Sequence, residues 1–314
     1  MKSIISTYSV MKTARSVFLL VFASVILGSC SKWSNGTIIP DTRYVDENIR
    51  IIELRDNVNV TLAHADMNHK AGCIEILAGE KLLDGITTET VEVEETEFYE
   101  HETITNLVIR NDNTLSHLRP YDYDISMTVY YDSLYQIIFN SNGTLDTDTL
   151  RGMAIRESDT VVSRTCSIQV EGGSGELDAK IACDKSITKY QEGTATVNLS
   201  GRVTFAYTSA SYNCHGQIHA KDLYSHIHYI KPYYSNSLID AQAYYMLDVK
   251  NENIGVVRYL RYRTTIVTHP WNEESHQFDT IIEPVQCPRI IRYNGDYYNT
   301  WTYNNSIPGL QYFD

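Results

Sequence analysis

The chain has 314 residues, 43% of them hydrophobic, which is enough apolar material for one large domain or two small ones. Its formal net charge of −13 argues against nucleic acid as a partner, because a nucleic-acid backbone requires a basic surface. The chain holds 24 tyrosines against 3 tryptophans and 7 phenylalanines, and tyrosine suits half-exposed strand positions, where the ring packs and the hydroxyl stays in water.

The N-terminal residues 1–30 have the pattern of a secretion signal rather than of a folded segment. Lys12 and Arg15 precede an apolar run at residues 17–27, which is too short for a convincing membrane-spanning helix. The run ends in Leu-Gly-Ser-Cys, and this ending resembles the bacterial lipobox, which implies a lipid on Cys30 after cleavage. The alternative is an ordinary signal peptide that happens to end in cysteine.

We expect residues 31–48 to be a polar linker that tethers the folded part to a membrane surface through Cys30. The rest of the chain has no second hydrophobic run long enough to span a bilayer. The sequence therefore predicts a protein of the cell envelope that is anchored to a membrane by lipid.

The mature part has the residue pattern of a β protein. Period-two alternation and β-rich composition predict strands within residues 49–62, 73–79, 105–111 and 125–139, and no segment predicts a helix of useful length. An acidic stretch at residues 89–102 is either a site for a divalent cation or a basic partner, or a solvated ribbon whose charges discourage edge-to-edge aggregation. We favour the solvated ribbon, because the stretch lacks the spacing of a calcium loop.

A repeat of about 20 residues organises the chain from Gly173 to Tyr262. Each copy is an apolar–polar–small triplet beside a glycine or small polar residue, and successive copies are 20, 21, 21 and 20 residues apart. The copies start at Leu177, Val197, Ile218, Ile239 and, more weakly, Tyr259. This pattern is typical of a solenoid, in which each strand pairs in parallel with the next at about 4.8 Å. We therefore predict an all-β fold, a single-domain parallel β-helix, right-handed because parallel crossovers almost always take that hand.

If each repeat forms one turn of the solenoid, or rung, then stacking of the rungs would align equivalent residues of the triplets in columns. The first residues of the triplets would form an inward core column, and a second inward column would hold Ala179, Leu199, Ala220 and Ala241. The middle residues would point outward: Asp178, Asn198, His219 and Asp240. In the fifth copy Leu260 takes the outward place, which fits a last rung covered by the C-terminal segment.

Several segments resemble, in their order and spacing, the head GIN domain family of auto-transporter adhesins, which are common as lipoproteins in Bacteroidetes. The matching segments include 51–54, 57–62, 78–83, 86–88, 107–109, 125–130, 134–137, 220–223 and 254–259. The resemblance implies one β-helix domain at residues 49–264. Residues 265–314 extend past the usual end of the family, and we expect this C-terminal extension to cap the domain. It also implies the outer membrane as the location. The residues after Cys30 lack the acidic run that resembles a surface-export signal, which favours the periplasmic side.

Four histidines lie near one another in the repeat region, at positions 215, 219, 226 and 228. They are either ligands of a metal ion or part of an outward polar ladder, in which His219 would hydrogen-bond to Asp240. By alternation, His226 and His228 share a strand face. We favour the ladder and assign no metal ligand and no cofactor.

The five cysteines other than Cys30 have no metal-binding spacing, so we expect most of them to be buried as small apolar residues.

Two surfaces are candidates for function. Asp178 and Asp240, with Lys180 and Arg202, resemble the exposed carboxylates and basic residues of β-helix polysaccharide lyases and hydrolases. Outward polar residues are, however, what any solvated solenoid requires, so we assign no catalytic residue.

Tyrosines concentrate in the last rungs, where they either bind a sugar or protein or pack against the end of the solenoid. The candidate ligand face is Asn198, His219, Asp240, Tyr233, Tyr234 and Tyr244.

The sequence thus predicts a non-enzymatic, lipid-anchored envelope protein whose β-helix binds a glycan or an envelope protein. A carbohydrate-active enzyme on the same scaffold and a purely structural role in envelope assembly are the alternatives.

Overall fold

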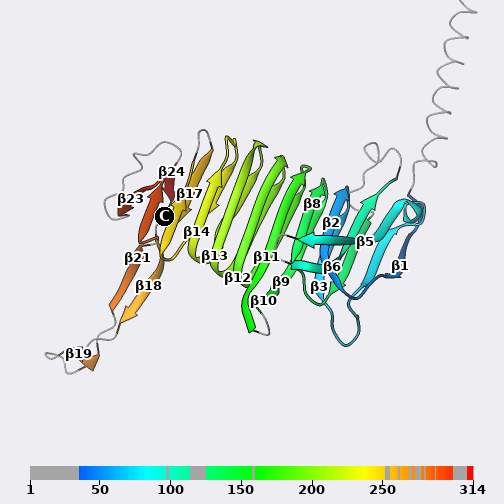
Figure 1. Ribbon diagram of the computed structural model, residues 1–314, viewed down its shortest axis with the longest axis horizontal. Helices are drawn as coiled ribbons and strands as arrows, with labels where there is room; N and C mark the ends of the chain where they lie inside the picture. Colours follow the sequence, from blue (N-terminus) through cyan, green and yellow to red (C-terminus); the bar gives the residue numbers. More distant parts are fainter. Residues whose placement is uncertain are drawn as a thin grey trace, which may run out of the picture.

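The computed structural model describes residues 35–96, 99–113, 125–157, 160–251, 255–260, 262–268, 271–272, 277–278, 281–286, 288–299 and 310–313 (Figure 1). Across these residues the protein is all-β, as predicted, and its helical structure is limited to a short 3-10 turn at Leu83–Gly85. In that same part of the chain, no helix is long and apolar enough to cross a membrane. The expected signal peptide and Cys30 lie outside the described residues.

The strands of the N-terminal half are β1 (Ile38–Tyr44), β2 (Ile49–Asp56), β3 (Asn59–His64), β4 (Cys73–Gly79), β5 (Ile86–Thr96), β6 (Tyr99–Asn111), β7 (Ile125–Tyr131), β8 (Gln136–Ser141), β9 (Thr144–Leu150) and β10 (Met153–Glu157). Those that follow are β11 (Thr160–Gly172), β12 (Glu176–Gly193), β13 (Thr196–Cys214), β14 (Gln217–Pro232), β15 (Leu238–Ala241), β16 (Met246–Val249), β17 (Val256–Leu260), β18 (Tyr262–Thr268), β19 (Trp271–Asn272), β20 (Gln277–Phe278), β21 (Ile281–Gln286), β22 (Ile290–Tyr293), β23 (Asp296–Asn299) and β24 (Leu310–Phe313). Twenty of these strands form one curled sheet.

The three longest strands, β12, β13 and β14, pair in parallel over both of their halves. Only two residues connect β12 with β13, yet the first residue of β13, Thr196, pairs with Glu176 at the start of β12. Each long strand must therefore turn back on itself. The turn in β12 lies at residues 182–185, where none of the residues is buried and the alternation of buried and exposed positions breaks.

The bends divide the parallel pairs into two stacks. The first stack contains β7, β3, β9, the first halves of β12, β13 and β14, and then β15, β17 and β24. The second stack contains β6, β2, β8, β11, the second halves of β12, β13 and β14, and then β16 and β22. Residues from both stacks belong to one buried apolar cluster, so the two halves of each long strand share a core.

The predicted core column is confirmed. Leu177 pairs with Val197, Val197 with Ile218, and Ile218 with Ile239, and all four side chains are fully buried. The second predicted inward column is also buried. The first column continues beyond the repeat through pairings that bring in Val60, Leu145, Val257 and Leu310. A single line of apolar residues thus runs through the first stack.

The predicted alignment of the fifth repeat is wrong by two residues. Ile239 pairs with Val257, and Asp240 pairs with Arg258, so Arg258 and not Leu260 takes the outward position. Tyr259 pairs with Ala241 and is fully buried. The error arose because two overlapping triplets, one starting at Val257 and one at Tyr259, both alternate apolar and polar residues.

The N-terminal part departs from simple stacking in chain order. Within the expected linker, residues 38–44 form β1, which pairs antiparallel with β4. The unit of β2 and β3 lies between that of β6 and β7 on one side and that of β8 and β9 on the other. The acidic stretch falls on β5 and β6, which form an antiparallel hairpin.

The expected C-terminal extension adds to both stacks. β22 pairs in parallel with β16, and β24 pairs in parallel with β17. Ile291 and Leu310 bring fully buried side chains to the core, so the β structure continues past residue 264. β18 and β21 form a separate two-stranded sheet, which projects from this end of the protein in Figure 1.

Candidate functional site

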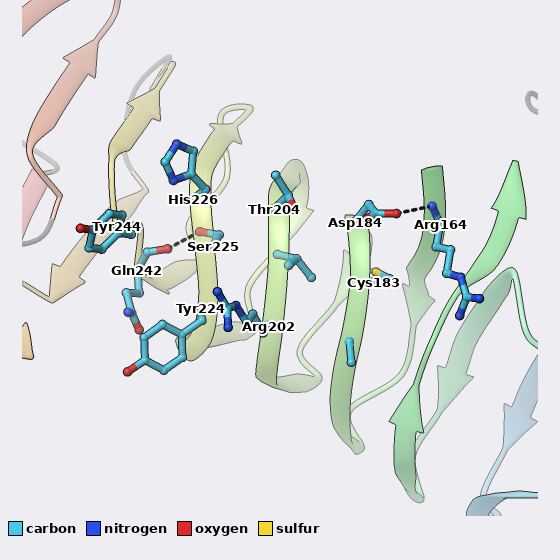
Figure 2. A pocket seen from close by; sticks show the side chains of 12 residues that line it. Arg164, Cys183, Asp184, Arg202, Thr204, Tyr224, Ser225, His226, Gln242 and Tyr244 are labelled. Atoms are coloured by element: carbon cyan, nitrogen blue, oxygen red, sulfur yellow. Dashed lines mark hydrogen bonds between the residues drawn. The ribbon is translucent and has the colours of Figure 1, made fainter. Parts of the chain in front are cut away.

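A pocket of about 980 Å³ opens at the bends of the long strands, and we call it the bend pocket (Figure 2). In an ideal strand, neighbouring residues point to opposite faces. Here three consecutive residues from each strand line the same pocket, because the chain changes direction at the bend. They are residues 182–184 of β12, 202–204 of β13 and 224–226 of β14, and Arg164, Gln242 and Tyr244 complete the lining.

Small side chains at the centre of each bend leave the space open. Cys183 pairs with Val203, and Val203 pairs with Ser225, so these residues form a row across the strands. Val203 and Ser225 are 4% and 2% exposed, which places them at the floor. Gly201, just before the bend of β13, has a φ of +106°, and a Cβ at this position would lie 2.1 Å from the carbonyl oxygen of Ile181. Only glycine fits this backbone geometry and close approach.

The rim of the bend pocket carries two arginines. Arg202 on β13 lies beside Tyr224. Arg164 on β11 lies at the end of the pocket that is away from Gln242 and Tyr244 (Figure 2). In the described part of the chain the guanidinium groups of both arginines make no hydrogen bond or ion pair. Asp184 accepts a hydrogen bond from the backbone N–H of Arg164 at 2.8 Å, which holds the two strands in register. The rim therefore offers two uncommitted cationic groups.

Two polar side chains of the pocket lining are deeply buried, Gln242 at 1% exposed and Ser225 at 2%. Gln242 has the larger polar group of the two. Its backbone oxygen accepts a hydrogen bond from the Ser225 hydroxyl at 2.6 Å and faces His228 Nδ1 at 3.2 Å. Its side-chain oxygen, Oε1, has no hydrogen-bond partner. Such an orphaned acceptor costs about 1–3 kcal/mol, so its retention calls for an explanation.

Aromatic rings form the remaining wall. Tyr224 and Tyr244 are 39% and 41% exposed, and His226 stacks on Tyr245 with ring centroids 5.3 Å apart. Arg289 donates a hydrogen bond to the Tyr244 hydroxyl at 3.0 Å and lies over the Tyr244 ring. These contacts hold the His226 and Tyr244 rings at defined positions, and Tyr224 and Tyr244 provide flat, half-exposed aromatic surfaces.

A second hollow, of about 680 Å³, lies next to the bend pocket on the same face of the first stack. We call it the ladder groove, since the predicted outward column lines it. Asn198 donates a hydrogen bond to Asp178 at 2.6 Å, and His219 Nδ1 lies 2.8 Å from Asp240. Arg258 donates to both oxygens of Asp240, at 2.6 and 2.9 Å, and this pairing raises the pKa of Arg258. The ladder is therefore largely satisfied by its own members.

The structure brings only some of the predicted ligand-face residues together. Asn198, His219 and Asp240 line the ladder groove, whereas Tyr244 lines the bend pocket. Tyr233 and Tyr234 follow the second half of β14, at the end of that strand away from the bend, where the Lys231 ammonium lies 4.2 Å from the Tyr233 ring centroid. Sequence reasoning missed the roles of Arg164 and Gln242, because no periodicity shows that a bend turns both side chains toward one pocket.

The predicted shared face of His226 and His228 is wrong. The bend lies between these residues, so His226 is exposed while His228 is fully buried. His228 Nε2 lies 2.9 Å from the Thr208 hydroxyl, and burial lowers the pKa of His228 to about 4. The described residues contain no group of three or more histidine, cysteine or acidic side chains that could hold a metal ion.

Four cysteines fall within the described residues, and all four are free: Cys73, Cys166, Cys183 and Cys214. Three are buried, as expected for small apolar side chains, and Cys183 is half-buried. Burial raises the pKa of Cys183 and of Cys214 to about 11, which keeps both thiols protonated and unreactive at neutral pH.

No protein-family model matches the chain, and no curated protein matches it. Among solved structures, the chain is similar to a protein from Bacteroides fragilis named as a putative adhesin, with a TM-score of 0.52 and 16% identity over 71% of this chain and 88% of the other. It is also similar to a protein from Parabacteroides distasonis named as a putative lipid binding protein, with a TM-score of 0.47 and 15% identity over 88% and 97% of the two chains. A protein from Parabacteroides merdae named as a putative adhesin has a TM-score of 0.42 and 12% identity over 90% and 98%. The first of these similarities shows that the chain shares its fold with the Bacteroides fragilis protein.

Proposed function

We propose that this protein is a non-enzymatic, adhesin-like protein of the cell envelope, which binds its ligand on the outer face of the first stack. One observation carries the proposal: the bend pocket and the ladder groove lie side by side on β12, β13 and β14. A hollowed face with fixed aromatic rings and uncommitted cationic groups suits binding, whereas an evenly polar surface would suit a scaffold. The names of the structural neighbours agree with this role, although they are names of other proteins.

The fold proposal is a right-handed parallel β-helix of the head GIN domain type. The parallel pairing of β12, β13 and β14 at spacings of 20 and 21 residues supports it, as does the buried column in the first stack. Each long strand then supplies one rung, and the two-residue connections close the coil.

The anchoring proposal is a lipid on Cys30 that holds the protein at the outer membrane, on the periplasmic side. The sequence ending Leu-Gly-Ser-Cys carries this proposal. Labelling of cells with a palmitate analogue tests it: the wild type should incorporate the label and Cys30→Ser should not. Equal labelling of the two proteins would contradict the anchor.

The geometry disfavours the enzymatic alternative at its predicted site. Both oxygens of Asp240 accept hydrogen bonds from Arg258, and His219 lies against one of them. Asp178 is engaged by Asn198. Carboxylates held in this way are poor candidates for general acids or nucleophiles, and their role in the ladder is to pair neighbouring strands.

Binding of the purified protein to a glycan array, together with crosslinking to envelope proteins in cells, tests the proposed function. We expect a glycan or protein hit that is lost when Tyr244 is changed to alanine. The absence of any hit in both experiments would contradict a binding role and favour a structural one.

A further inference from the structure

We propose that the bend pocket binds an extended acidic polysaccharide laid across the strands, with sugar carboxylates on Arg202 and Arg164. This inference rests on the proposed function and names the class of ligand and the place where it binds. Three properties of the bend pocket lead to it: its direction, its charge and its orphaned acceptor.

The direction of the pocket favours a long, narrow ligand. Its lining starts at Arg164 on β11, crosses β12, β13 and β14, and ends at Gln242 and Tyr244, just after β15 (Figure 2). Four strand spacings of about 4.8 Å make the pocket about 19 Å long across the strands. One strand spacing is close to the length of one sugar in an extended polysaccharide. A chain laid across the strands would therefore present similar groups to successive strands.

The charge of the rim favours an anionic ligand. Arg164 and Arg202 face one acidic lining residue, Asp184, whereas the whole chain carries a net charge of −13. The two arginines are two strand spacings apart across the strands and two residues apart along them, which places their backbones about 12 Å from each other. Long arginine side chains can reach carboxylates on alternate sugars from these positions. A guanidinium group binds a carboxylate with two parallel hydrogen bonds, so these side chains are suited to uronic acids.

Gln242 adds an unsatisfied hydrogen-bond acceptor to the lining of the pocket. Its Oε1 atom has no partner, although the residue is 1% exposed and its backbone oxygen is fixed by Ser225. A sugar hydroxyl would supply the missing donor. The exposed rings of Tyr224 and Tyr244 would then pack against the apolar faces of sugar rings. A compact anion such as phosphate would use the arginines but would leave both rings and most of the length of the pocket empty.

Binding of defined oligosaccharides to the purified protein tests the proposal. The probes are hexasaccharides of galacturonate, mannuronate and hyaluronan, each compared with its carboxyl-methylated form by titration calorimetry. We expect at least one acidic hexasaccharide to bind, with an affinity reduced about tenfold or more by methylation and by Arg202→Gln. Arg110→Gln, which removes an arginine from the distant β6 and breaks only half-exposed contacts with Glu89, Asp112 and Thr87, is the matched control and should bind as the wild type does.

Gln242→Met separates a binding role from a structural one. Because this change removes an unsatisfied buried acceptor, the melting temperature should stay the same or rise while affinity falls. The proposal is overturned if no acidic hexasaccharide binds at millimolar concentration, if methylation has no effect, or if Arg202→Gln binds normally. Binding of neutral glycans or of an envelope protein alone would overturn the acidic ligand while leaving the adhesin-like function standing.

Discussion

Changing His228 tests the packing behind the bend pocket. The side chain is fully buried in the second stack, with Nδ1 against the backbone oxygen of Gln242 and Nε2 against the Thr208 hydroxyl. A carbonyl oxygen only accepts, so Nδ1 carries the proton and Nε2 accepts from Thr208. The ring is neutral in the folded protein, and protonation would place an uncompensated charge in the core.

The size of the effect follows from the shift of the pKa. Burial lowers the pKa of His228 from 6.5 to about 4, so the unfolded chain binds a proton at higher pH than the folded protein does. The resulting stabilisation is fully present above pH 6.5 and is lost as the pH falls toward 4. Between pH 7.5 and pH 5, His228 alone should reduce the free energy of unfolding by about 2 kcal/mol.

Urea unfolding at pH 7.5 and pH 5 measures this contribution. His228→Gln should be less stable than the wild type at pH 7.5, but its loss of stability between the two pH values should be smaller by about 2 kcal/mol. His226→Gln, which changes the exposed neighbour, is the matched control and should keep the pH dependence of the wild type. If His228→Gln and the wild type lose stability equally, the ring is not buried as a neutral group and the reasoning fails.

Three further changes test other parts of the fold by urea unfolding. Ile218→Ala removes a fully buried member of the core column and should cost about 2–5 kcal/mol; a loss below about 1 kcal/mol would contradict its central position. Gly201→Ala forces a methyl group against the Ile181 carbonyl oxygen and should lower the free energy of unfolding by more than about 1 kcal/mol. An unchanged free energy of unfolding would show that the backbone at Gly201 does not require glycine. Asp240→Ala leaves Arg258 and His219 without their shared partner and should cost about 1–3 kcal/mol, while Asp178→Ala, at a more exposed rung, should cost less; equal costs would contradict the ladder.

The periodicity of the sequence was enough to predict the all-β class, the core column and the outward ladder. Each of these depends on the spacing of residues along a strand and on parallel pairing at a fixed interval. The interaction of His219 with Asp240 follows from the same spacing, because stacking places them on adjacent strands. The triplet rule failed in the fifth copy, where two overlapping triplets fitted equally well and only the observed pairing of Val257 separates them.

The bend pocket could not be predicted in this way. Alternation assigns the residues of β12 from Glu176 to Gly193 to two opposite faces, but a bend at residues 182–185 turns three consecutive side chains toward one hollow. The order in which the N-terminal strands stack could not be predicted either. Sequence spacing does not reveal that β2 and β3 lie between two pairs of strands that come later in the chain. Gly201 indicates a bend in β13, but β12 and β14 bend with Ile181 and Leu223 at the equivalent positions, so glycine reveals only one of the three bends.

Hydrogen–deuterium exchange of the protein with and without the acidic hexasaccharide that binds most tightly tests the bend pocket as the binding site most directly. Binding in the bend pocket should slow exchange at residues 202–204, 224–226, 242 and 244, which line it, and should leave exchange unchanged in the hairpin of β5 and β6. Protection confined to that hairpin or to the turn after β14, with none at the bends, would contradict the bend pocket as the binding site.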